Sequence, residues 1–201
     1  MRQDDSNLAE VDSLSSIGRQ LLRLDAEHAY LRLVVDSPGN LAAKSMLESL
    51  SAGDLIDGPI PIINRSDAQG VMAGLWLRHD WLEESHRISQ QLETSSGSMW
   101  HAIMHRREGD FSNSKYWYNR AAAHPVLKTL PARAGETINN FPADKSVFRI
   151  IASGWNPAAF VDLVEAVHDK PNDPRHRLAT VIQEIEWRLL FEHCTRGASG
   201  K

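Results

Sequence analysis

The stretch of this 201-residue chain that says most about its fold is residues 101–121, which read HAIMHRREGDFSNSKYWYNRA. Both sides of the Gly109-Asp110 pair have helical composition and spacing, and a glycine is a common way to end a helix. The stretch therefore predicts two helices joined by a tight turn at Gly109-Asp110.

The spacing of small residues in this stretch resembles that of a tetratricopeptide hairpin. With Gly109 as the turn glycine of that repeat, Ala102, Ser114 and Ala121 occupy its small packing positions, and Tyr118 occupies its aromatic position. The resemblance implies two antiparallel helices whose backbones pack closely through these residues.

Two histidines stand where that repeat usually has buried apolar residues. They are His101 and His105. Burying an imidazole is costly unless it has a polar partner. We therefore expect both rings to be buried, each to have a polar partner, and this seam to carry the chemistry of the protein.

A longer resemblance links most of the chain to a family of uncharacterised soluble proteins from bacteria and fungi. It rests on residues 101–117, on His124-Pro125, on WNPAAFVDL at 155–163 and on EIEWRLLF at 184–191, and it extends over roughly residues 65 to 195. The resemblance implies that residues 101–117 are the centre of the protein, and it implies no activity.

Composition predicts one domain at residues 1–195, followed by a disordered tail at 196–201. The chain is 42% hydrophobic and 24% charged, with a net charge of -4, which is ordinary for a soluble protein and unfavourable for nucleic-acid binding. The single cysteine, Cys194, suits a reducing compartment, and neither a signal peptide nor a membrane span is recognisable. The predicted location is the cytoplasm.

Helical periodicity continues through most of the chain. The expected helices cover residues 8–35, 40–50, 66–78, 81–93, 157–168 and 175–193, in addition to the central pair. Residues 125–156 hold several prolines and glycines and predict one long loop that covers the site. The predicted fold is all-α, with tetratricopeptide-like antiparallel hairpins over residues 72–123 and capping helices at both ends.

Histidines and glutamates recur at i, i+4 and i+7 on two neighbouring helices, so each set lies on one helical face. Imidazole and carboxylate groups arranged in this way suit a divalent transition metal shared between the helices. The predicted metal ligands are His101, His105, His79, Glu83 and His86.

Other side chains of the same region complete the predicted site. The predicted catalytic residues are His101, His105, Glu108, Lys115 and Tyr116. The predicted binding residues for an acidic small molecule are Arg106, Arg107 and Asn113. The arginines could instead be solvated or pair with charges at the helix end, and Lys115 and Tyr116 could be surface and packing residues.

Two alternatives to this site remain open from the residues alone. The histidines could form a hydrogen-bonded core without a metal. The Glu-x-x-His pairs Glu83/His86 and Glu165/His168 have the spacing found in di-iron carboxylate bundles.

The sequence supports two functions of different classes. The first is a small helical enzyme whose His-rich site acts on an acidic small molecule. The second is a tetratricopeptide-like module that binds a peptide or protein through an exposed helical groove, without catalysis. The long helix predicted at the N-terminus could also form an oligomer interface.

Overall fold

The computed structural model describes residues 13–57, 62–121, 124–142 and 144–200. Helices make up 67% of the structure and the described residues form no strand, so the predicted all-α class is confirmed. In order along the described chain, the helices are α1 (Ser16–Arg23), α2 (Leu41–Leu47), the short 3-10 helix η2 (Ala52–Leu55), α3 (Arg65–Arg78), α4 (Leu82–Ser89), α5 (Ser95–Glu108), α6 (Phe111–Arg120), α7 (Pro125–Asn139), α8 (Lys145–Phe148), α9 (Pro157–Val167) and α10 (Pro174–Ser199).

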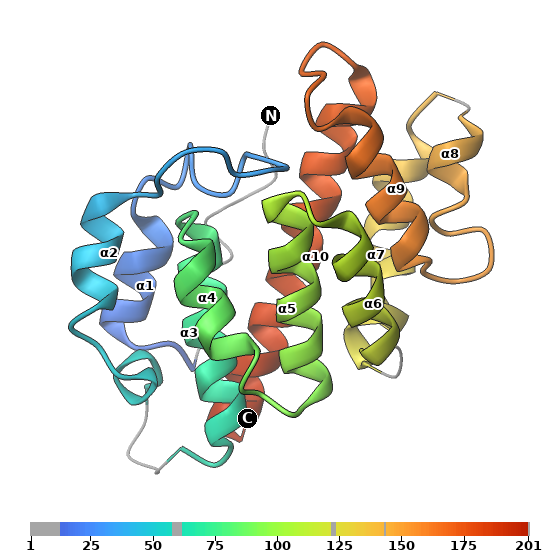
Figure 1. Ribbon diagram of the computed structural model, residues 1–201. Coiled ribbons are helices and arrows are strands. Elements are labelled where there is room, and N and C mark those ends of the chain that lie inside the picture. Colours follow the sequence, from blue (N-terminus) through green and yellow to red (C-terminus); the bar gives the residue numbers. More distant parts are fainter. Residues whose placement is uncertain (1–12, 58–61, 122–123, 143, 201) are drawn as a thin grey trace.

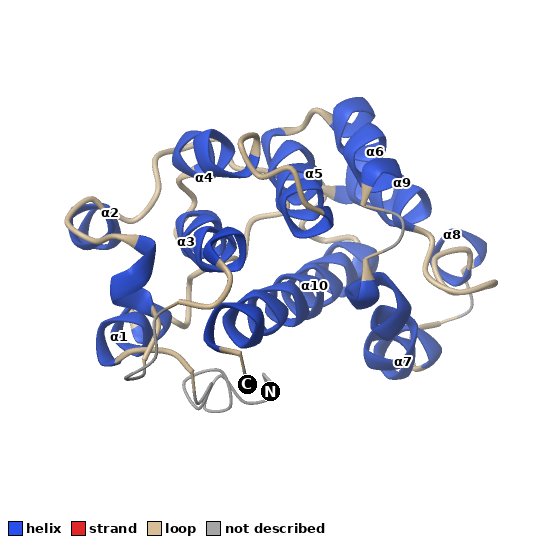
Figure 2. Ribbon diagram, turned by 90° about the horizontal axis from the view of Figure 1, so that it is seen from below, coloured by secondary structure: helices blue, strands red, loops and turns tan. Residues whose placement is uncertain are grey.

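The long helix α10 runs through the molecule behind α5, with α1 and α2 on one side and α6 to α9 on the other (Figure 1). It packs against α3, α7 and α9, and Figure 2 shows it crossing beneath α3 and α5. Near its start, Leu178 and Ile182 belong to a core shared with α7, α8 and α9. Further along, Trp187 and Phe191 belong to a second core shared with α3 and α5. One helix thus joins two hydrophobic cores.

Helices α3 to α6 lie where the sequence predicts two consecutive hairpins, and each packs against the next. Gly109 ends α5 in the left-handed conformation with a φ of 88°, which favours a residue without a Cβ. The Ser114 hydroxyl donates a hydrogen bond to the carbonyl of Ala102 at 2.8 Å, so α5 and α6 approach closely at the predicted small positions. The likeness of these hairpins to tetratricopeptide repeats stays a prediction.

Several helix ends agree with local sequence signals. Asn40 caps α2 by accepting a hydrogen bond from the Ala43 amide, and Asn156 caps α9 in the same way. The helix expected over residues 66–78 begins one residue earlier, because Asn64 caps α3 by accepting a hydrogen bond from the Asp67 amide. None of the described helices is both long enough and apolar enough to cross a bilayer.

The long N-terminal helix predicted over residues 8–35 is wrong for the described part, which begins at residue 13. The helix α1 ends at Arg23, and residues 24–30 form turns in which Asp25 and Tyr30 have positive φ values of 51° and 61°. Leaving the helical path lets Tyr30 bury its ring, 4.2 Å from the Arg107 guanidinium and 5.7 Å from Trp187. The described residues 13–35 thus do not form the long helix on which the predicted oligomer interface depends, and oligomer formation stays a prediction.

The loop predicted over residues 125–156 is also wrong, because α7 and α8 lie within it. His124 and Pro125 form a favourable start for α7, since a proline at the first helical position lacks only an amide that would be unpaired. Pro131 lies inside the helix, where proline normally costs about 3 kcal/mol. Burial of Leu130 and Ile138 opposes that cost. Helix α7 packs against α10, so it is part of the core and not a lid.

The C-terminal tail predicted to be disordered from residue 196 is instead helical as far as Ser199. Ala198 is fully buried, and its carbonyl accepts a hydrogen bond from the Ile63 amide at 3.0 Å. A partner from the segment just before α3 thus supports α10 beyond the end that its own periodicity predicts.

Candidate metal centre

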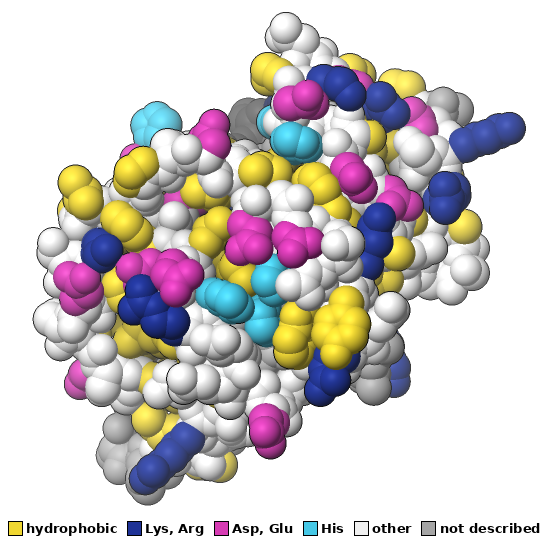
Figure 3. All heavy atoms as spheres, viewed as in Figure 1, with side chains coloured by type: hydrophobic (Ala, Val, Ile, Leu, Met, Phe, Trp, Pro, Cys, Tyr) yellow, Lys and Arg dark blue, Asp and Glu magenta, His cyan; other side chains and the backbone are white. Residues whose placement is uncertain are grey.

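Three histidines come together where α4 packs against α5. His86 comes from α4, and His101 and His105 come from α5. One ring nitrogen of each histidine lies within 4.8 Å of a ring nitrogen of the other two. Histidine side chains gather near the middle of the face shown in Figure 3, beside acidic side chains. His86 is partly exposed while the other two are buried, so the cluster has a wet side and a dry side.

The ring of His101 is buried and makes no hydrogen bond. His101 is only 4% exposed, and neither ring nitrogen has a hydrogen-bond partner among the described residues. It is stacked between the indole of Trp117, at 4.0 Å between ring centroids, and the imidazole of His105, at 4.6 Å. The predicted burial is therefore confirmed, and the predicted polar partner is wrong for this residue.

Burial lowers the pKa of His101 to about 4, and the neighbouring rings of His105 and His86 act in the same direction. The imidazole is thus neutral at physiological pH. A neutral imidazole keeps a lone pair, which is the form that binds a metal ion.

His105 is oriented by hydrogen bonds at both ends of its ring. Its Nδ1 lies 3.0 Å from Oε1 of Glu108, and its Nε2 lies 3.0 Å from the side-chain nitrogen of Asn113. An ionised carboxylate only accepts, so Nδ1 donates to Glu108, and the Nε2 lone pair accepts from the Asn113 amide. A metal ion at Nε2 would have to displace that amide. A carboxylate on the far nitrogen of a histidine is the usual outer partner of a metal-binding imidazole. Glu108 and Asn113 therefore lie beside His105, and their predicted catalytic and substrate-binding roles stay predictions.

No family model, curated protein or solved structure shows significant similarity to this chain. The likeness of residues 101–117 to a protein family thus stays a prediction. What the histidine cluster does depends on the chemistry of its own residues.

Two of the predicted metal ligands lie elsewhere. His79 is buried at the end of α3, with Nε2 at 3.0 Å from the carbonyl of Leu21. Glu83 is exposed and pairs with Arg87, one turn further along α4. Equal i, i+4, i+7 offsets do not keep these residues on one face here, because His79 lies before α4 begins at Leu82. Only His86 of that set faces α5.

The arginines predicted to bind an acidic substrate are internal. Arg106 and Arg107 are both 0% exposed. Arg106 donates to Glu186 at 2.7 Å and to the hydroxyl of Tyr118, which itself donates to Glu186. Arg107 donates to Asp80 and to the carbonyl of Leu77, both at 2.5 Å.

These pairs make the substrate-binding assignment of Arg106 and Arg107 wrong. A desolvated guanidinium requires a fixed carboxylate, and each has one inside the protein. Neither arginine is free at a rim where an anionic ligand could reach it.

The contacts of Lys115 and the exposure of Tyr116 suit surface positions on α6. The Lys115 ammonium pairs with Asp162 at 2.6 Å and with Glu165 at 3.8 Å, both on α9. Tyr116 is 54% exposed. Their catalytic assignment is not supported by position: Lys115 ties α6 to α9, and Tyr116 is a surface residue.

Sequence reasoning missed two residues that shape the site. Trp117 stacks on His101, although its spacing suggests only an ordinary core residue. Glu186 is fully buried as the partner of Arg106. A glutamate one turn after Ile182 on an apolar helical face was the available signal for a buried ionic partner.

Other clusters of reactive side chains are less suited to chemistry. Ser96 and His124 are hydrogen-bonded at 3.1 Å, but Nδ1 of His124 accepts from the Val126 amide, so Nε2 is the donor and cannot remove the serine proton. Burial raises the pKa of Cys194 to about 12, which keeps the thiol protonated. Among the described residues, the groups able to hold a metal ion include neither Glu165 nor His168, so the di-iron alternative has no support.

Proposed function

We propose that this protein binds a divalent transition metal ion through His86, His101 and His105. The observation that carries the proposal is the buried ring of His101, which faces two further imidazoles and makes no hydrogen bond to a described residue at either nitrogen. A buried polar group without a partner costs about 1 to 3 kcal/mol. Coordination to a metal ion would satisfy one of these nitrogens.

The arrangement is compatible with known metal chemistry. Nitrogen ligands lie about 2.0–2.1 Å from Zn²⁺ in a tetrahedral site, which places them roughly 3.3 Å apart. One ring nitrogen from each histidine lies within 4.8 Å of the other two. The rings of His101 and His105 are stacked at an interplanar angle of 18°, so they would have to turn relative to each other to direct both lone pairs at one ion. Three imidazoles favour Zn²⁺, Ni²⁺ or Cu²⁺ over Mg²⁺ and Ca²⁺, which prefer oxygen ligands.

The number of ligands favours a catalytic site over a purely structural one. Structural zinc sites use four protein ligands, whereas catalytic sites use three and keep one position open for water or substrate. With three histidines as ligands and the orienting carboxylate of Glu108, the proposed function is that of a small helical metalloenzyme, in which the metal ion, when bound, would supply activation of water. This proposal retains the enzyme hypothesis without the arginine-bound substrate.

The alternative of a peptide-binding module needs an exposed groove of polar and basic side chains. The two central candidates for such a groove, Arg106 and Arg107, are committed to internal ion pairs. The metal proposal has a specific supporting observation in the unpartnered His101 ring, and the peptide proposal has none.

Titration of the chelator-treated protein with Zn²⁺ and with Co²⁺ tests the proposal. Isothermal calorimetry should give one ion per chain, and Co²⁺ should give visible absorption from nitrogen coordination. Cu²⁺ should quench the fluorescence of Trp117, which stacks on a proposed ligand. Replacing His86, His101 or His105 by Ala should weaken binding more than about hundredfold, since even outer partners of a metal site change affinity 10- to 100-fold.

The matched control is His28→Ala, because that imidazole is 74% exposed in its pair with Asp25. The control should bind one ion with unchanged affinity. If folded variants of His86, His101 and His105 bind the ion as tightly as the control, the proposal is overturned, and the three histidines are packing residues.

A further inference from the structure

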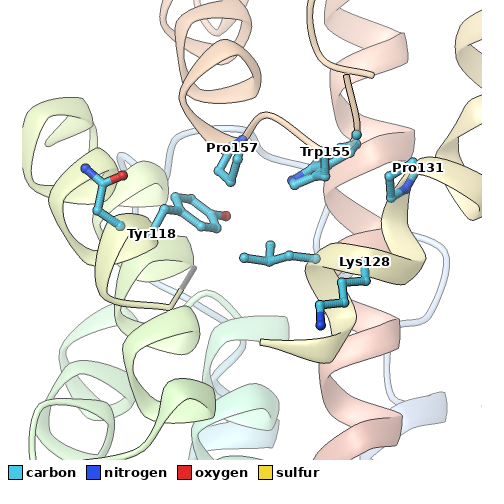
Figure 4. A pocket seen from close by; sticks show the side chains of 8 residues that line it. Tyr118, Lys128, Pro131, Trp155 and Pro157 are labelled. Carbon is cyan, nitrogen blue, oxygen red and sulfur yellow. The ribbon is translucent and has the colours of Figure 1, made fainter. Parts of the chain in front are cut away.

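A hollow of about 330 Å³ lies between α6, α7 and the start of α9, apart from the histidine cluster. The side chains of Tyr118, Lys128, Pro131, Trp155 and Pro157 surround it, with the Trp155 ring pointing into the space between Tyr118 and Lys128 (Figure 4). At the ~30 Å³ that a water-sized group occupies in a liquid, the hollow has room for roughly ten non-hydrogen atoms. It lies at the small end of the range typical of ligand sites.

The wall of the hollow is mostly apolar and aromatic. Two prolines, Leu127 and the ring of Tyr118 contribute to it. The Tyr118 hydroxyl is already used, since it accepts from Arg106 and donates to Glu186. The hydroxyl of Tyr118 is therefore not free to bind a ligand, and Tyr118 contributes to the lining as a nearly buried residue.

The indole nitrogen of Trp155 is a buried donor without an acceptor among the described residues. An unpaired buried N–H group is costly and normally finds a partner. Its ring also packs against Phe160, at 5.7 Å between centroids, which holds the indole in place. The wall of the hollow thus contains a covered hydrogen-bond donor that no described residue satisfies, and a ligand would reach it by displacing the atoms that cover it.

The charge around the hollow has one sign. Lys128 lines it and is exposed, and no ion pair to Lys128 exists among the described residues. None of the described residues that line the hollow is acidic. Asn119, whose amide can donate or accept, is the other polar side chain in the lining.

We propose that this hollow binds a small monocarboxylate with an apolar body, such as a short-chain or aromatic acid. The carboxylate would accept a hydrogen bond from the Trp155 indole and pair with the Lys128 ammonium. The apolar body would contact Leu127, Pro131 and the ring of Tyr118. The inference does not depend on the metal proposal, because Tyr118 and Trp117 are adjacent on α6 and their side chains point about 100° apart.

Titration of the metal-free ¹⁵N-labelled protein with benzoate and with hexanoate tests this inference by NMR. The indole N–H resonance of Trp155, assigned as the one lost in Trp155→Phe, should shift saturably with each acid. Trp155→Phe keeps an aromatic ring without the donor, and Lys128→Gln keeps the stem without the charge. Each change should weaken benzoate binding about tenfold or more, as expected for a hydrogen bond to a charged group.

Two controls make the result specific. Lys145→Gln removes an exposed lysine that does not line the hollow, and it should leave benzoate binding unchanged. Benzamide, the neutral analogue, should bind at least about tenfold more weakly than benzoate. Equal binding of benzamide, absence of a saturable shift, or a folded Lys128→Gln variant that binds benzoate as the wild type does would overturn the inference.

Discussion

At the scale of single residues, two buried histidines differ in how their nitrogens are satisfied. His124 donates to Ser96 and accepts from the Val126 amide, whereas neither nitrogen of His101 has a hydrogen-bond partner in the part of the chain that the structure describes. Both have a pKa lowered to about 4, with burial as the main cause. Two similarly buried imidazoles thus differ, because the ring of His124 is hydrogen-bonded and the ring of His101 lacks described partners. This difference is expected if His101 serves to bind a ligand.

We expect His101→Phe to stabilise the metal-free protein by about 1 kcal/mol, because it removes an unsatisfied polar group and keeps the stacking on Trp117. His124→Phe should instead destabilise it by about 1 to 3 kcal/mol, because Ser96 loses its partner. Urea unfolding in the presence of a chelator measures both. If His101→Phe costs as much as His124→Phe, the ring of His101 has a stabilising role that its surroundings do not reveal.

At the scale of helices, α5, α6 and α10 are joined through one buried ionic group. Arg106, Tyr118 and Glu186 come one from each helix and are mutually hydrogen-bonded. The carboxylate and hydroxyl keep the pKa of Arg106 above its ordinary value although burial acts against its charge. Because Arg106 follows His105 directly, this group also fixes the rotation of α5 and so the direction in which the histidines face.

Removing one charge from this group should be expensive. We expect Glu186→Gln to lower the free energy of unfolding by about 3 to 5 kcal/mol, since it leaves the Arg106 guanidinium buried without its counter-ion. The matched control on the same helix is Glu192→Gln. The carboxylate of Glu192 lies 3.7 Å from the guanidinium of Arg196, which is largely exposed, so losing this ion pair should cost less than about 1 kcal/mol. Chemical denaturation compares the two, and similar losses would show that the buried pair has no special importance.

At the scale of the whole molecule, buried histidines make stability depend on pH. Burial, with the nearby Arg78, lowers the pKa of His79 to about 4, and burial with the nearby His193 does the same for His124. Between pH 6.5 and 4 these rings are protonated in the unfolded chain and neutral in the folded one. Protons therefore favour unfolding, so the stability is fully present above pH 6.5 and declines toward pH 4.

We expect the free energy of unfolding to fall as pH is lowered through this range, by up to about 1.4 kcal/mol per pH unit for each such histidine. In the metal-free protein, His101 is a third histidine that takes up a proton on unfolding. Burial raises the pKa of Asp67, so this carboxyl releases at most one proton on unfolding and opposes the trend. Urea titrations at pH 7, 6 and 5 measure the slope. The slope should drop by about one proton in His124→Phe, and an unchanged slope would contradict the assignment.

The sequence by itself determined the features that depend on neighbours along the chain. The all-α class follows from helical periodicity, and the turn at Gly109 follows from a glycine in a left-handed position. The caps at Asn40 and Asn156 follow from side chains that bond to amides three residues away. His101 and His105 share a face because residues four apart always do so on a helix.

Only the tertiary structure decided which distant groups meet. The choice of His86 over His79 depends on where α4 starts and how it rotates against α5. The inward direction of Arg106 and Arg107 depends on partners 80 and 27 residues away, which no local spacing reveals. Helix α7 forms despite Pro131 because its apolar face is buried against α10. Burial energy and ionic pairing between remote segments outweigh local propensity at these places, and they give the histidine cluster its shape.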